Sequence, residues 1–188
     1  MDLNSAEDSN LVKAAAASAV VIICLAIGFG FALNRTLGLV GRSLTRGFIV
    51  VEHVDDLVDE LDRLNVDQRA LLATGGDRYS EGVAESVTGM LSHVSALQGL
   101  HFHDQALNLQ IVRVSHSVNW VLDLVGQIND LQQLYGTQVA MALLDADGET
   151  SIQTAKMEAK QLKRLTTEHV MYRVRGERKL RSVLEVVF

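Results

Sequence analysis

The sequence predicts an all-α protein in which one N-terminal transmembrane helix continues into an up-down-up-down four-helix bundle. Three observations support this prediction. The twenty residues from Ala14 to Leu33 include no charged side chain, apolar residues recur after them at spacings of three and four, and the 188 residues include no proline. Because proline is common at the edges and corners of strand-and-loop folds, its absence favours helices joined by tight turns.

The uncharged stretch has the length of a membrane span. At about 1.5 Å per residue its helix is roughly 30 Å long, which matches the hydrocarbon core of a bilayer. A cleaved signal peptide usually has a basic leader, whereas the leader here is acidic, and a buried core helix of this length normally carries a polar face. We therefore expect a polar leader over residues 1–13, a transmembrane anchor over 14–34, the four-helix bundle over 35–185 and a C-terminal tail over 186–188.

The first helix of the bundle is predicted to continue directly from the anchor. One buried face is marked by apolar residues at three-four spacing, interrupted where Gly47 takes a core-facing position: Leu37, Val40, Leu44, Val51, Val54, Val58 and Leu61. We expect one helix from about Ala14 to Thr74. Gly75 and Gly76 would end it, and Asp77 would cap the N-terminus of the next helix.

Three further helices are predicted after this turn. The second is short, with core positions Val83, Val87, Met90, Val94 and Leu97, and is expected to end near Gly99. The third is the most regular, with core positions Leu107, Ile111, Val114, Val118, Val121, Val125 and Ile128, followed by Tyr135 and Val139. The segment from Asp145 to Gly148 has the composition of a turn, so the fourth helix is expected from about Glu149 to Leu184. The second helix would therefore span only part of the bundle.

The composition restricts the class of function. The net charge of −6 argues against a nucleic-acid partner, and the single cysteine, Cys24, excludes an intramolecular disulfide. The sequence has no serine–histidine–aspartate order near a strand–turn, no phosphate-binding glycine loop and no pair of carboxylates with an acid–base pattern. We expect neither an enzyme nor a cofactor.

Two clusters of metal-ligand residue types are not interpreted as metal sites. The first starts like a calcium loop but lacks the glycine and glutamate that such a loop requires: Asp145, Asp147 and Glu149, with Thr150 and Lys156 at the failing positions. The second, His101, His103 and Asp104, has no further ligand nearby in the sequence, so a solvated loop is expected. His116 and His169 are expected at the surface or boundary of the bundle.

The end of the first soluble helix resembles a family signature. From Asp67 to Tyr79 the chain reads Asp-Gln-Arg-Ala-Leu-Leu-Ala-Thr-Gly-Gly-Asp-Arg-Tyr. This order is similar to the glutamine-arginine-glycine, leucine-leucine, threonine-glycine-aspartate, aromatic segment of the third class of CHASE domains, with Ala70 at the glycine position and Gly76 inserted. Those are extracytoplasmic four-helix sensory domains of bacterial histidine kinases, cyclases and chemoreceptors. The resemblance extends over about Arg35 to Arg181 and implies a sensory bundle.

The resemblance and the helix pattern single out candidate residues. Five form the predicted ligand site or bundle-end network: Gln68, Arg69, Asp77, Tyr79 and Trp120. In the alternative interpretation Arg69 only stabilises the helix C-terminus through the helix dipole. Trp120 is expected to pack beside the core, with its N–H bound to a partner, or to stack on a ligand. Three arginines form a basic group beside the anchor: Arg35, Arg42 and Arg46.

The side of the membrane is predicted in two opposite ways. These arginines indicate a cytoplasmic bundle under the positive-inside rule, whereas the resemblance implies an extracytoplasmic one, which we favour for a single-pass protein of a bacterial inner membrane. The predicted function is a sensory or signalling domain without its own output module that acts by helix shifts and partner contacts. The alternative is an accessory or scaffold subunit of a membrane complex. Expected partners are the membrane, a second copy or a partner membrane protein, and a small-molecule ligand.

Overall fold

The computed structural model of this chain describes residues 44–187, and their side chains as far as Gly176. The predicted leader and anchor, together with Arg35 and Arg42, lie outside the described residues. Within residues 44–187 no helix combines the length and apolar character that a membrane crossing requires.

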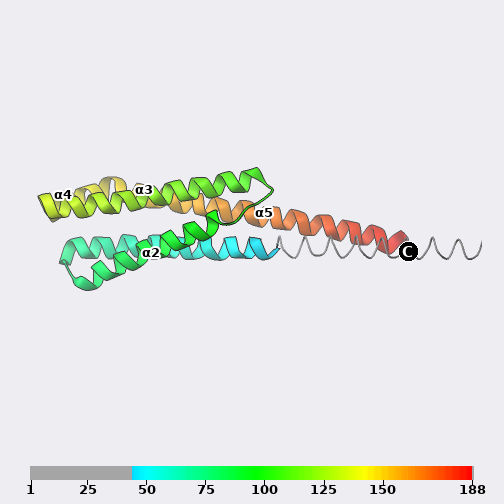
Figure 1. Cartoon of the computed structure of the whole chain (residues 1–188), viewed down its shortest axis with the longest axis horizontal. Coiled ribbons are helices and arrows are strands. Elements are labelled where there is room, and N and C mark those ends of the chain that lie inside the picture. Colours follow the sequence, from blue (N-terminus) through cyan, green and yellow to red (C-terminus); the bar gives the residue numbers. More distant parts are fainter. Residues whose placement is uncertain (1–43, 188) are drawn as a thin grey trace, which may run out of the picture. The chain divides into compact units, whose positions relative to one another are not determined.

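The described part of the chain consists of helices with short connections and contains no strand, which confirms the predicted all-α class (Figure 1). A helix over residues 44–74 is followed by α2 (Asp77–Gln98), α3 (Gln105–Tyr135), α4 (Thr137–Leu143), the π-helical turn η1 (Leu144–Gly148) and α5 (Glu149–Val187). Because α4, η1 and α5 follow one another without a break, they form the fourth arm of a four-helix bundle. Figure 1 shows α5 continuing past the level of the α2–α3 connection.

The first turn of the bundle lies at Gly75 and Gly76, as predicted. Gly75 has φ +66°, the left-handed conformation that favours glycine, and its N–H donates to the carbonyl of Leu71 at 2.8 Å. The prediction that Asp77 is the N-cap is wrong, because Gly76 has the extended backbone of the cap and Asp77 is already the first helical residue. A carboxylate in the first turn is still favourably placed relative to the helix dipole.

The last turn of the bundle lies at Gly136, not at residues 145–148. Gly136 has φ +86° and ψ 174°, a region that essentially only glycine adopts, and α3 ends immediately before it. The predicted turn at Asp145–Gly148 is therefore wrong, as is the extension of the third helix to Val139, which lies in α4. The turn-like composition of residues 145–148 is accommodated in η1, where Gly148 is buried against Leu144: a Cβ at Gly148 would lie 2.6 Å from Leu144 Cδ1.

Most of the main core is formed by the predicted three-four stripes, but in the first described helix Val50 and Leu57 take core positions, and the predicted Val51 and Val58 are only half-buried. Its buried members come from all four arms, and include Val54, Leu57, Leu61, Met90, Val94, Leu107, Ile111, Val114, Val118, Ile152, Ala155, Ala159 and Leu162. Gly47 is also buried, as its place in the stripe implies, because a Cβ there would lie 2.5 Å from Val170 Cγ2 on α5. Burial of each Val, Leu or Ile side chain contributes about 1.5–3 kcal/mol, so these stripes account for most of the stabilisation of the bundle.

A second core cluster lies at the Gly136 end of the bundle and contains no residue of α2. Its buried members are Leu72, Leu124, Ile128, Ala140 and Leu144, from residues 44–74, α3, α4 and η1. At this end the other three arms therefore pack together, and α2 lies beside them.

Ion pairs join the helix over residues 44–74 to the fourth arm, and on the first of these helices they recur every seven residues. Lys163 Nζ lies 2.6 Å from Asp55 Oδ1, Lys156 Nζ lies 2.5 Å from Asp62 Oδ1, and Arg69 Nη1 lies 2.6 Å from Asp145 Oδ1. Each pair is partly exposed and adds little to the free energy of unfolding. The partners on the fourth arm run from Lys163 back to Asp145 as the first helix runs from Asp55 to Arg69, so the two helices are antiparallel. The pairs also fix the register, since sliding either helix along the other would break all three.

Candidate ligand groove between α2 and α3

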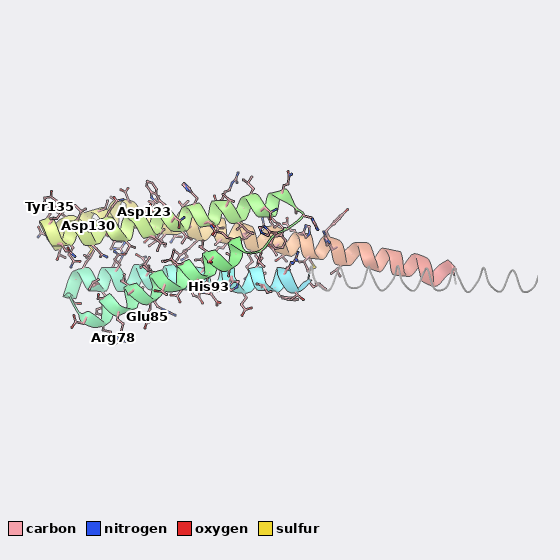
Figure 2. The ribbon with its side chains drawn as sticks, viewed as in Figure 1. Arg78, Glu85, His93, Asp123, Asp130 and Tyr135 are labelled. Atoms are coloured by element: carbon pink, nitrogen blue, oxygen red, sulfur yellow. The ribbon has the colours of Figure 1, made fainter. Side chains whose placement is uncertain are left out.

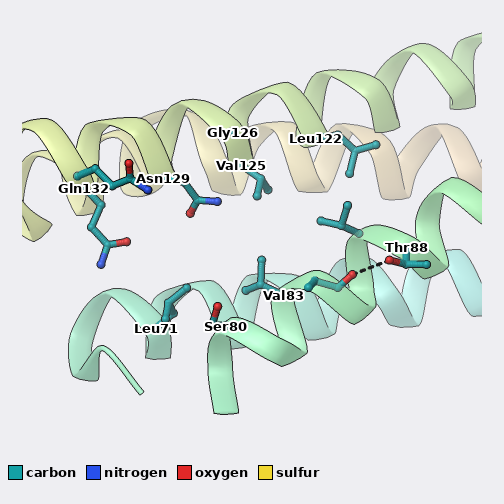
Figure 3. Close-up of a pocket in the computed structure, with 12 residues that line it drawn as sticks. Leu71, Ser80, Val83, Thr88, Leu122, Val125, Gly126, Asn129 and Gln132 are labelled. Atoms are coloured by element: carbon teal, nitrogen blue, oxygen red, sulfur yellow. Dashed lines mark hydrogen bonds between the residues drawn. The ribbon is translucent and has the colours of Figure 1, made fainter. Parts of the chain in front are cut away.

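An open groove with a volume of about 890 Å³ lies between α2 and α3. It lies toward the end of the bundle where the second core cluster contains no residue of α2. Figure 3 shows side chains of both helices facing the space between them, with Ser80 and Val83 on α2 and Val125 and Asn129 on α3. The volume lies within the range of about 300–1,000 Å³ that is usual for small-molecule sites.

The lining of the groove is uncharged. Val83 and Val125 are buried, and Leu71, Val87 and Leu122 are half-buried and pack against the main core. Polar side chains lie beside this apolar surface, namely Ser80, Thr88, Asn129, Gln132 and Gln133. Such a surface suits an uncharged ligand with an apolar body and a few hydrogen-bonding groups.

Small residues keep the groove open. Ala84 on α2 and Gly126 on α3 both line it, and a Cβ placed on Gly126 would meet no other atom within 4 Å. The hydroxyl of Thr88 donates to the Ala84 carbonyl at 2.9 Å, the dashed line of Figure 3, so its proton is held within α2. The amide groups of Asn129 and Gln132 are the more suitable donors and acceptors for a ligand.

The five predicted site residues do not meet in one pocket. Arg69 lies on the side of its helix that faces the fourth arm, where its Nε donates to Asn65 Oδ1 at 3.2 Å and its Nη2 lies 3.7 Å from Glu149 Oε2. Together with its bond to Asp145 this makes a network at the end of the bundle, and in it Arg69 binds partner side chains rather than only the helix end. Gln68 is buried, and among the described residues its Nε2 has no hydrogen-bond partner.

Tyr79 and Asp77 lie at the start of α2, away from this network. Asp77 is exposed, and Tyr79 lines a shallow, charged hollow of about 400 Å³ with Arg63, Asp67 and Arg78. The expectation that Trp120 is packed is wrong, because 59% of its surface is exposed. Its neighbours in the sequence, Val118 and Val121, take the core-facing positions of α3, and Trp120 falls on the outer side between them.

The predicted basic group is represented by Arg46, whose Nη1 donates to the carbonyl of His101 at 3.3 Å. His101 and His103 are exposed in the connection between α2 and α3, as expected for a solvated loop. His116 is exposed on α3.

Asp104 and His169 form a contact that the sequence did not predict. Asp104 caps α3, since its Oδ1 accepts the N–H of Ala106 at 2.8 Å, and its Oδ2 lies 3.1 Å from His169 Nδ1 on α5. The Ala106 N–H and the His169 side chain both favour the charged carboxylate and together hold the pKa of Asp104 below its usual value, against a smaller opposing effect of burial.

The pKa of Glu149 is likewise lowered. Gln153 Nε2 donates to its Oε1 at 2.9 Å and Asn65 Nδ2 to its Oε2 at 3.1 Å, and the charges of Arg69 and Lys156 act in the same direction. Glu149 is therefore an ionised member of the Arg69 network at neutral pH.

No protein-family model, curated protein or solved structure matches this chain. The similarity to CHASE domains thus depends on the segment from Asp67 to Tyr79 quoted above, and the function it implies enters below as a proposal.

Proposed function

We propose that this chain is a membrane-tethered four-helix sensory module that binds an uncharged small molecule in the groove between α2 and α3. The observation that carries the proposal is the groove itself: an apolar surface with a few polar groups, at the end where α2 is absent from the second core cluster. A ligand seated there would contact both helices and would favour the conformation in which they lie closest together.

A ligand-induced movement of α2 can be transmitted directly to the helix over residues 44–74. α2 is joined to the helix over residues 44–74 by only Gly75 and Gly76, so a movement of α2 acts on the end of that helix. Helix shifts of an angstrom or two are a common form of signal in packed helices. The predicted anchor over residues 14–34 would pass the shift toward the membrane, with the bundle on the extracytoplasmic side and a second copy or a partner membrane protein as receiver.

A scaffold or accessory subunit of a membrane complex is the second candidate, and exposed apolar side chains on α3 favour it. Leu109, Val112 and Trp120 are 55%, 62% and 59% exposed. With His116 they follow the three-four spacing of one helix face, which lies away from the core. A partner protein would cover this face without using the groove.

The experiment is a titration of the full chain in lipid nanodiscs with a set of uncharged aliphatic and aromatic fragments, followed by methyl NMR of the valines and leucines. We expect a subset of fragments to shift Val83, Val87, Leu122 and Val125 while leaving core methyls such as Val54 unchanged. In Gly126→Leu the added side chain occupies the groove, so these shifts should be lost.

Gly176→Leu is the matched control, because Gly176 also has no atom within 4 Å of a Cβ but lies on α5, outside the groove. It should bind fragments like the unmodified chain. If no fragment shifts the groove methyls, or if Gly126→Leu binds fragments as well as Gly176→Leu, the groove is not a ligand site. That result would favour the scaffold or accessory subunit over the sensory module.

A further inference from the structure

Two imidazole rings face each other between the helix over residues 44–74 and α2. His53 Nδ1 lies 3.1 Å from His93 Nδ1, and the ring centroids are 5.4 Å apart with the planes inclined at 55°. Both side chains are half-buried, and Figure 2 labels His93 on α2. Two nitrogens this close either share a proton or bind a common cation.

Asp56 supplies a third ligand atom from the same helix as His53. Residues three apart lie on one helix face, so the carboxylate of Asp56, which is exposed, lies on the same face as His53. One atom from each of His53, Asp56 and His93 forms a group in which all atoms lie within 4.8 Å of one another. In a tetrahedral zinc site, metal–ligand distances of about 2.0–2.2 Å put neighbouring ligand atoms about 3.3 Å apart, close to the separation of the two nitrogens here.

We propose that His53, His93 and Asp56 bind a divalent transition-metal ion of the zinc class. Two imidazoles and one carboxylate are the donor set that such ions prefer, and three protein ligands leave one position for water. Each ring would carry its proton on Nε2, which leaves both Nδ1 atoms free to bind the metal.

The site joins elements that are distant in the sequence. His53 and His93 are forty residues apart, and a shared ion would fasten α2 to the first described helix. His93 lies five residues beyond Thr88, which lines the groove. The ion would therefore hold the part of α2 that packs in the main core through Met90, Val94 and Leu97. The metal site does not depend on the proposed ligand groove.

The test is isothermal titration of untagged full chain in nanodiscs with Zn²⁺ alone, after treatment with a chelator, together with the visible spectrum of the Co²⁺-loaded protein. We expect one ion per chain and a Co²⁺ spectrum of low coordination number. His53→Ala and His93→Ala should each weaken binding at least tenfold and remove the Zn²⁺-dependent rise in Tm, and Asp56→Asn should weaken binding by less.

His116→Ala is the matched control, since His116 is an exposed histidine on α3, and it should bind Zn²⁺ like the unmodified chain. Helical circular dichroism of each variant separates loss of a ligand from loss of fold, and His93→Asn provides a smaller polar replacement if His93→Ala unfolds. Equal Zn²⁺ affinity in folded His93→Ala and His116→Ala, or no binding to the unmodified chain at micromolar Zn²⁺, would overturn the proposal.

Discussion

Asp104 shows how one residue acts both as a helix cap and as a contact between helices. Its carboxylate accepts the Ala106 N–H and lies against His169, and both contacts favour the ionised form. Because its pKa is lowered in the folded state, the unfolded chain takes up the proton more readily. The stabilisation is therefore complete above the ordinary pKa of 3.8 and is lost as the pH falls through the lowered value.

For Asp104→Asn we predict a pH-dependent loss of stability. Asparagine keeps the cap but not the charge, so the free energy of unfolding should fall below that of the unmodified chain at neutral pH, and this deficit should shrink as the pH falls below the ordinary pKa of 3.8. Urea unfolding at neutral pH and at a pH below 3.8 measures this. Asp104→Ala removes the cap as well as the contact with His169, and at neutral pH it should cost about 1 kcal/mol beyond the loss in Asp104→Asn. A deficit of Asp104→Asn that is the same at both pH values would contradict the account.

At the residue scale, apolar spacing in the sequence predicted most core positions but not all, since Val51 and Val58 are only half-buried. Val54, Leu61 and Val114 are fully buried, and each lies on the helix face that the recurring apolar residues define. The prediction was wrong for Trp120, which was expected to pack because it neighbours the apolar stripe but lies on the outer side of α3. Contacts such as His53 with His93 depend on which helices are neighbours, and no local pattern in the sequence contains that information.

At the scale of elements, the conformation of Gly136 determines where the fourth arm begins. Its φ of +86° and ψ of 174° place it where a Cβ is strained. We predict that Gly136→Ala lowers the free energy of unfolding by about 1–3 kcal/mol. Gly126→Ala is the control, because it lies within helix α3 with open space around a Cβ and should raise stability by up to about 1 kcal/mol.

Urea unfolding of the two variants tests this directly. If Gly136→Ala were as stable as the unmodified chain, the reversal would have to lie elsewhere, for example at the Asp145–Gly148 segment that sequence composition favoured. Helix ends at Thr74 and Gln98 were predictable because glycines follow them. The reversal at Gly136 has the same signal, a glycine after a long helix, but the apolar spacing continues through Val139 and conceals it.

At the scale of the whole molecule, the bundle was predictable and the groove was not. Heptad-like stripes on every arm define four packed helices, and these stripes are visible in the sequence. The groove arises from a difference between the two ends: α2 supplies Met90, Val94 and Leu97 to the main core but nothing to the second cluster. In the first half of α2, Val83 belongs to the main core and Ser86 is buried, so only the neighbouring helices reveal the open space.

The ion pairs between the first described helix and the fourth arm belong to the same scale. Asp55 and Asp62 are separated by one heptad, as are their partners Lys163 and Lys156, and this repeat could be found in the sequence once an antiparallel pairing is assumed. Such pairs specify register more than they add stability.

The central claim, that a ligand in the groove moves α2 toward α3, is tested most directly by a distance between the two helices. Glu85 on α2 and Asp130 on α3, both exposed and labelled in Figure 2, are replaced by spin-labelled cysteines in a chain that also carries Cys24→Ala. Double electron–electron resonance in nanodiscs is then recorded with and without a fragment that shifts the groove methyls. We predict a shortening of an angstrom or two on binding, and none in Gly126→Leu. An unchanged distance distribution at saturating fragment would contradict the claim.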